Sequence, residues 1–186
     1  DDLKDKFDAN ETTLAELEAT LTRRVGDLGE LFGVFRQMAD DTQTMLYDSL
    51  ITAEHPQRKQ AISVLAESEE VPTIPQMRLL WGLLLEETAL SSQVSRFESE
   101  IVEPGGRNYS ADVVRVGTFN VITGDRYLNY ISDTDQLVEL PRQPQGYVRS
   151  SANDLYGSSP AEQVGFYIDP SRGALLGLLV QSPSLG

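Results

Sequence analysis

A heptad repeat runs through the first fifty residues and constrains the fold of this chain more than any other feature. Steps of four and three residues in alternation, from Leu3 to Met45, visit thirteen positions, of which ten are apolar. A 3.5-residue repeat held over six heptads is typical of a coiled-coil seam rather than of an ordinary globular helix. Residues 1–53 would form a rod roughly 80 Å long. Such a rod cannot bury its own seam, so it needs either a returning helix of the same chain or other copies of the chain.

The residues that we assign to the seam between copies lie on one face of this predicted helix. They are Leu3, Phe7, Asn10, Leu14, Leu17, Leu21, Leu28, Leu31 and Phe35. A polar seam residue such as Asn10 commonly fixes register and oligomer number at some cost in stability. Arg24, also on the repeat, can direct its charge past the seam toward a carboxylate.

Two further helices are expected within residues 1–104. The His55-Pro56 pair ends the first helix near residue 54, because proline disfavours helical geometry in the residue before it. Residues 57–68 predict a short helix, and residues 74–103 predict a third. The third helix has its own seam of Leu80, Leu83, Glu87, Leu90, Val94, Phe97 and Ile101. Two long heptad helices joined in this way most simply form an antiparallel hairpin. The first helix would project beyond the shorter third helix, and its free part would need other chains.

The charge and the residue pattern of the sequence change near Pro104-Gly105-Gly106. Residues 1–104 carry a net charge of −12 and residues 105–186 a net charge of −2. Residues 113–121, 126–131 and 136–140 show strand patterns separated by turn residues, which indicates a β-meander. We therefore expect an α+β fold, in which a long coiled-coil helical hairpin (1–104) is followed by a small antiparallel β-meander module (105–186) with short covering helices.

Two short helices are expected to cover the meander. Residues 151–156 predict one or two helical turns, and residues 171–180 predict an apolar last helix. Asp169 is the expected N-cap of that last helix, with Pro170 in its first turn. Arg172 would lie unfavourably for the helix dipole, so it is either a solubilising surface residue or is held by a carboxylate of the meander.

Enzymatic chemistry is not expected, and neither is a cofactor or a metal. The chain has no cysteine, and its one histidine, His55, precedes a proline, so no nucleophile–base pair or histidine cluster can be assembled. Residues 133–135 (DTD) lack the distal glutamate of a calcium loop and predict a hairpin turn. The glycines match no phosphate-binding motif. A net charge of −14 argues against binding to nucleic acid or to anionic membrane surfaces.

The sequence contains no run of eighteen apolar residues, so we expect no segment of it to span a membrane. The first residues also lack the basic and apolar regions of a signal peptide. Because the heptad repeat has already begun at Leu3, we expect the natural chain to be longer than these 186 residues.

Several runs of residues follow one another in a recognisable order. They are residues 113–120 (VVRVGTFN), 126–128 (RYL), 137–144 (LVELPRQP) and 169–176 (DPSRGALL), with residues 28–37 (LGELFGVFRQ) upstream. Together they resemble the periplasmic N-terminal region of extended MotA/TolQ/ExbB-type proton-channel proteins, the TtpC-like third components of some bacterial TonB systems. The residues of this family motif are Arg115, Gly117, Phe119, Asp169, Pro170, Arg172 and Gly173.

The resemblance implies a place on the periplasmic side of the bacterial inner membrane. It implies a signal peptide and more coiled coil before residue 1, and membrane helices soon after Gly186. The whole protein would be a channel subunit that helps couple proton motive force to TonB-dependent outer-membrane transport. None of the ion-conducting residues would lie in this piece, and the motif would mark a fold rather than catalysis.

The same resemblance implies the partners. Copies of the chain would form a homo-oligomer, with a pentamer in the full-length protein. TonB-, ExbB- and ExbD-type components and periplasmic accessory proteins would be further partners, and the membrane would be contacted only through segments that this chain lacks. The alternative is a free-standing periplasmic coiled-coil adaptor with no channel of its own. Apolar segments of about twenty residues after Gly186 would distinguish the two.

Overall fold

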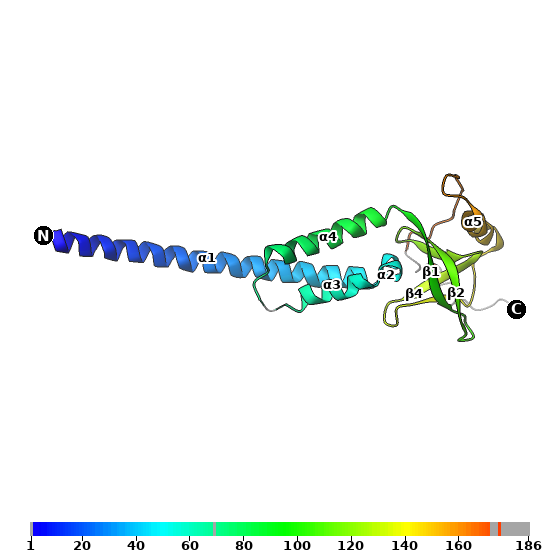
Figure 1. Cartoon of the computed structure of the whole chain (residues 1–186), viewed down its shortest axis with the longest axis horizontal. Coiled ribbons are helices and arrows are strands. Elements are labelled where there is room, and N and C mark those ends of the chain that lie inside the picture. The colour runs from blue at the N-terminus through cyan, green and yellow to red at the C-terminus, as the bar shows by residue number, and fades with distance from the viewer. Residues whose placement is uncertain (1, 69, 172–174, 176–186) are drawn as a thin grey trace.

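The computed structural model describes residues 2–68, 70–171 and 175. Its elements are α1 (Asp2–Tyr47), α2 (Leu50–Glu54), α3 (Gln57–Ala66), α4 (Ile74–Leu90), β1 (Val94–Val102), β2 (Asn108–Val116), β3 (Asn120–Thr123), β4 (Arg126–Ile131), β5 (Gln136–Glu139) and α5 (Gly146–Gly157). The N-terminal part of α1 projects as a rod, α3 and α4 lie beside its C-terminal part, and the strands form the opposite end of the molecule (Figure 1).

A small apolar core joins the C-terminal part of α1 to α3 and α4. It consists of Phe35, Ala39, Leu46, Ile62, Leu65, Ala66, Leu80 and Leu83. Helix α4 begins with a capping box, in which Thr73 accepts from the backbone of Gln76 and the Gln76 side chain accepts from the backbone of Thr73. The helical part is therefore a three-helix base from which α1 continues alone.

The first helix ends earlier than expected. Helix α1 stops at Tyr47, and α2 starts after Ser49, whose hydroxyl accepts a hydrogen bond from the backbone of Ile51 at 3.3 Å. The hydroxyl of Thr52 donates to the carbonyl of Leu46 at 2.6 Å. In a continuous helix, that carbonyl would have accepted a hydrogen bond from a backbone N–H one turn further on. The break redirects α2, so that Leu50 and a neighbouring alanine pack against the interior of the sheet.

The expected third helix over residues 74–103 is wrong in its second half. Helix α4 ends at Leu90, and Val94–Val102 form β1. Val94, Phe97 and Ile101 are spaced for a helix, but all nine residues of β1 pair with β2, and this long-range pairing decides the local structure.

The strands form a closed barrel in the order β1-β2-β3-β4-β5. Each consecutive pair is antiparallel, so the first and fifth strands run in the same direction and can close the barrel only as a parallel pair. That pair aligns Ile101 with Leu137 and Val102 with Val138. The expected fold of a helical hairpin followed by a small antiparallel β-meander is therefore wrong, although its broad α+β class fits.

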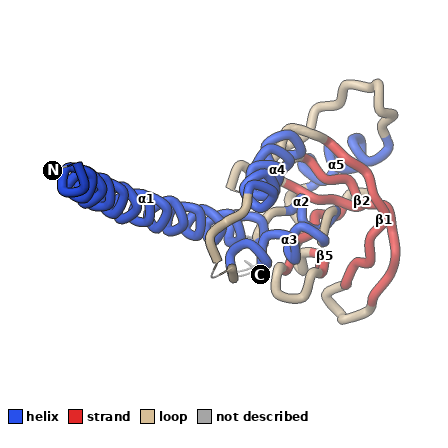
Figure 2. The backbone as a smooth tube through the Cα atoms, turned by 60° about the vertical axis from the view of Figure 1, so that its left-hand side comes forward, coloured by secondary structure: helices blue, strands red, loops and turns tan. Residues whose placement is uncertain are grey.

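Both faces of the central strands are covered. The interior holds Ile101, Val113, Val121, Leu128, Tyr130 and Leu137, and α2 packs against it. The outer face of β3 and β4 carries Ile122 and Tyr127, which α5 covers through Ala152. The tube view shows α1 extending away from the strands, with α2, α3 and α4 next to them (Figure 2), and α5 lies at the end of the strands far from α1 (Figure 1).

The expected module boundary and the two expected covering helices can also be compared with the structure. Residues 104–106 form the turn between β1 and β2, closed by the Glu103 backbone donating to the carbonyl of Arg107 at 2.9 Å, so the sheet begins before the expected boundary. The helix expected over residues 151–156 is the longer α5. The helix expected over 171–180 lies outside the described residues. Within the described part of the chain, no helix is both long and apolar enough to cross a membrane.

Candidate interaction surface

The free part of α1 carries an exposed apolar seam. From Lys6 to Leu31 every side chain is exposed except the half-buried Thr20. The predicted seam residues Phe7, Asn10, Leu14, Leu17, Leu21, Leu28 and Leu31 all lie in this stretch. Phe7 is 67% exposed and Leu21 is 64% exposed. Leu3 lies in α1, but its side chain belongs to the part that is not described. Large contiguous apolar surface of this kind marks interaction sites.

The repeat changes its role at Phe35. This residue, which we assigned to the seam between copies, is only 8% exposed because it packs within the three-helix base. The buried apolar positions that follow are Ala39 and Leu46, one residue later than the predicted repeat positions Met38 and Met45, whereas Thr42 is buried at its predicted position. On the C-terminal side of Leu31, α1 therefore has two apolar faces, of which one is buried in the base and the other is exposed.

The second face of α1 forms one wall of an apolar groove. Leu31, Val34, Phe35 and Met38 of α1 and Met77, Leu80, Trp81 and Leu84 of α4 line this groove of about 210 Å³. Trp81, the only tryptophan of the chain, is 62% exposed at its edge. Because Leu31 belongs both to the seam and to the groove, the two form one continuous apolar strip.

A buried arginine ties the helices to the barrel. Arg115 of β2 has no exposed surface, and its Nε donates to Oε2 of Glu54 in α2 at 2.8 Å. Its Nη1 donates to the carbonyl of Leu90, at the end of α4, at 3.1 Å and to that of Gly117 at 2.8 Å. The hydroxyl of Ser95 donates to the same Glu54 oxygen at 2.7 Å. The Arg115 side chain thus joins α2 and α4 to β2 and the turn after it, and Glu54 extends the contact to Ser95 of β1.

A second buried ion pair joins the helices to one another. Nη2 of Arg58 in α3 lies 2.7 Å from Oε2 of Glu87 in α4. The other carboxylate oxygen of Glu87 accepts from the hydroxyl of Ser49, which caps α2, at 2.8 Å. This pair fixes α3, α4 and the start of α2 as a unit.

A third contact joins α3 to the turn between β4 and β5. Residues 132–135 form the hairpin turn that was expected, with Asp135 at a φ of 54°. The ammonium of Lys59 donates to the carboxylate of Asp135, and the hydroxyl of Tyr130 donates to the same oxygen at 2.6 Å. These two hydrogen bonds, that of Lys59 above all, lower the pKa of Asp135 from its usual value.

Part of the family motif meets at the joint between α4 and the barrel. Gly117 has a φ of 54°, and its N–H donates to the carbonyl of Gln93 at 2.9 Å. A Cβ atom at Gly117 would lie 2.2 Å from the carbonyl oxygen of Ser91, so only glycine fits there. Phe119 lies beside this turn and lines a small cavity together with Glu87. The tight turn at Gly117 thus fixes how the end of β2 meets the segment after α4.

The rest of the motif lies after α5. Asp169 is buried, its N–H donates to the side-chain oxygen of Asn120 at 2.8 Å, and its carboxylate accepts from the N–H of Ser171 at 2.8 Å. This hydrogen bond closes a turn at the exposed Pro170, and the helix that Asp169 was expected to cap lies outside the described elements. Arg172 and Gly173 lie outside the described residues, as does the predicted pairing of Arg172.

Sequence reasoning missed Glu54, Arg58 and Trp81. Glu54 and Arg58 lie on either side of the helix end that His55-Pro56 predicts, but nothing in their neighbours in the sequence indicates a buried partner. Glu87 gave a usable signal, because a carboxylate on a heptad seam requires a partner when it is buried.

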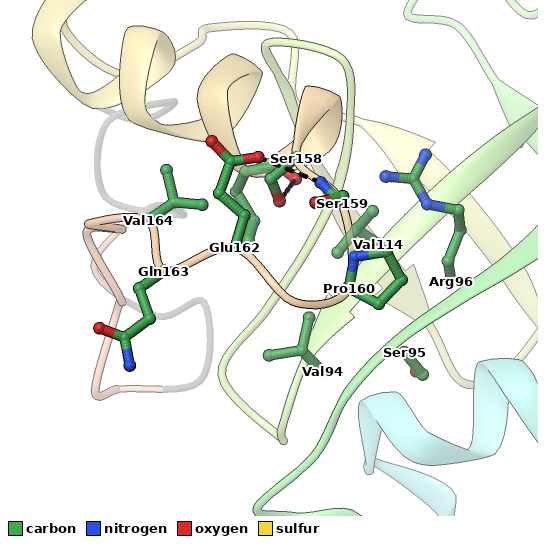
Figure 3. Close-up of a pocket in the computed structure, with 11 residues that line it drawn as sticks. Val94, Ser95, Arg96, Val114, Ser158, Ser159, Pro160, Glu162, Gln163 and Val164 are labelled. Carbon is green, nitrogen blue, oxygen red and sulfur yellow. Dashed lines mark hydrogen bonds between the residues drawn. The ribbon is translucent and has the colours of Figure 1, made fainter.

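The residues that line the cavity in Figure 3 do not form a catalytic site. It measures about 500 Å³ and lies between the start of β1 and the segment after α5, with Val94, Val114 and Pro160 among its lining residues. Arg96 donates to the carbonyl of Tyr156, and Glu162 accepts from the backbone of Ser159 at 3.4 Å. Its charged groups therefore bind the chain itself. Among the described residues, no cluster of three metal-ligating side chains occurs.

Comparisons with protein-family models, with curated proteins and with solved structures found no match. The functional argument therefore depends on the exposed strip of α1 and α4, on the joint that fixes α1 to the barrel, and on the sequence motif.

Proposed function

We propose that this chain is the periplasmic part of a MotA/TolQ/ExbB-type proton-channel subunit, in which α1 joins copies into a coiled-coil stalk. The observation that carries the proposal is the exposed heptad seam from Phe7 to Leu31 on a helix that projects from a fixed base. Each large apolar side chain on it would contribute about 1.5–3 kcal/mol if it were fully buried. The family motif supports the assignment to a channel subunit, and a five-fold stalk is the assembly that this family implies.

The stalk acts through its length rather than through catalysis. Copies rooted in one membrane lie close together, which raises their effective concentration and favours even a weak coil. From the membrane, the stalk extends toward TonB-type and accessory components on the periplasmic side. Residues 104–106, where we placed the boundary between the two modules, form a hairpin turn within the sheet and therefore do not act as a pivot between stalk and barrel. The contacts of Arg115, Arg58 and Lys59 instead favour a barrel and stalk that move as one body.

The test is a deletion of residues 11–24, which removes two complete heptads and keeps the seam in phase. It shortens the rod by about 20 Å. We expect the domain to fold and the channel to assemble, while energy-dependent uptake of a TonB-dependent substrate falls severalfold, because the stalk no longer reaches its partner.

The matched control is Glu16→Gln, a change on the exposed face of the same segment that leaves its length intact. It is expected to leave uptake unchanged at equal expression. Normal uptake by the shortened variant would contradict a spanning role for the stalk.

A further inference from the structure

We propose that the groove between α1 and α4 is filled by α1 of a second copy of this chain. Copies would then be joined along the base as well as along the free rod. The proposal rests on the proposed function, because it specifies how neighbouring copies in the stalk meet.

Continuity of the apolar strip is the first argument. The seam passes Leu28 and Leu31, and the groove begins at Leu31 and continues through Val34 and Met38. A helix rises about 1.5 Å per residue, so any helix that covers the seam at Leu28 enters the groove within its next two turns. A partner that follows the seam of the free rod past Leu31 therefore enters the groove.

The pattern of the groove walls indicates that its occupant is a heptad helix. On α4, Met77, Trp81 and Leu84 are separated by four and three residues, and Leu80, which is buried in the base, also lines the groove. Two helices with apolar residues at these spacings leave a groove between them, and a third helix can fill that groove with its row of apolar side chains. Helix α1 is a described segment of this chain with the required repeat and with its apolar face exposed.

Charge at the groove favours the same occupant. Arg78 follows Met77 and lies one turn before Trp81, and it is exposed. Asp27 and Glu30 precede Leu31 on α1 and are also exposed. None of these three side chains forms a hydrogen bond or an ion pair with other described residues. In the proposed arrangement, these acids of a parallel neighbour pair with Arg78, which adjoins the groove residue Met77 in the sequence.

Occupation of the groove would couple the stalk to the barrel. Helix α4 leads into β1 after residues 91–93, and Arg115 of the barrel holds the last carbonyl of α4. A neighbour that packs on α4 therefore contacts the element that positions the barrel. Association of the rods and the arrangement of the barrels would change together.

Trp81 reports directly on the groove, because the chain has no other tryptophan. The experiment records Trp81 emission and acrylamide quenching of the 186-residue chain over rising concentration, beside sedimentation of the same samples. We expect the emission maximum to shift to shorter wavelength and quenching to fall about twofold or more in step with association, as the ring leaves water.

Two variants test the geometry. Met38→Glu places a charge in the groove and is expected to weaken association about tenfold and to abolish the Trp81 shift. The control is Val64→Glu, on the exposed face of α3 away from the groove, which is expected to change neither. Arg78→Glu is expected to weaken association by a smaller factor, and Glu30→Arg in the same chain is expected to restore it.

Association by sedimentation without any change at Trp81 would overturn this proposal and leave the stalk formed by the free seam in place. A chain that stays monomeric at high micromolar concentration, with unchanged Trp81 emission, would overturn both. A Trp81 shift that survives Leu14→Asp but not Met38→Glu would support the groove independently of the free seam.

Discussion

Replacing Arg115 with alanine is expected to lower the free energy of unfolding by about 3–5 kcal/mol. The substitution leaves the carboxylate of Glu54, which is mostly buried, without its cationic partner. It also removes the donor to the carbonyls of Leu90 and Gly117, so α2, α4 and the barrel lose their shared contact. Urea unfolding followed by circular dichroism measures the change.

The control for this variant is Arg107→Ala. Arg107 also pairs with a glutamate, Glu103, but it lies on the exposed tip of the hairpin between β1 and β2. Solvent screens that pair, so the unfolding midpoint should stay nearly unchanged. A loss below about 1 kcal/mol for Arg115→Ala would contradict the role of this arginine as the tie between helices and barrel.

Replacing Gly117 with alanine is expected to cost about 2–5 kcal/mol of unfolding free energy. Part of the cost is the left-handed backbone, and the remainder is the contact of the new Cβ with the carbonyl of Ser91. Since backbone groups meet on both sides, the joint between α4 and β2 has to move.

Gly124→Ala separates the two causes. Gly124 has the same φ of 54°, but no atom lies within 4 Å of the position that its Cβ would take. Only the backbone cost remains there, about 1–2 kcal/mol. Equal losses for the two variants in urea unfolding would show that close packing against Ser91 is unimportant.

Local sequence patterns predicted some elements and failed at others for a physical reason. The strand expected over residues 126–131 is β4, because alternation and turn residues at both ends define it locally. The strand expected over 113–121 is divided at Gly117, and a glycine inside a strand pattern is a signal for such a turn. Strand β1 was missed, because its apolar spacing also fits a helix and only its pairing with β2 distinguishes the two.

The interaction surface was partly accessible from the sequence. The repeat identified the exposed seam residues from Phe7 to Leu31, and their coverage by other copies stays a prediction. It placed Phe35 in the same seam, because periodicity alone cannot show where α3 and α4 begin to cover α1. The groove at Trp81 requires two helices to be placed side by side, so it could not be predicted before the fold was known.

The central claim, that the free part of α1 joins copies, is tested most directly by sedimentation equilibrium at rising concentration. The unmodified chain is expected to associate, and a double variant with Leu14→Asp and Leu21→Asp is expected to stay monomeric. Its control, Thr12→Asp with Thr22→Asp, adds the same charge to exposed positions off the seam and should associate as the unmodified chain does. Identical sedimentation of the seam variant and the unmodified chain would contradict the claim.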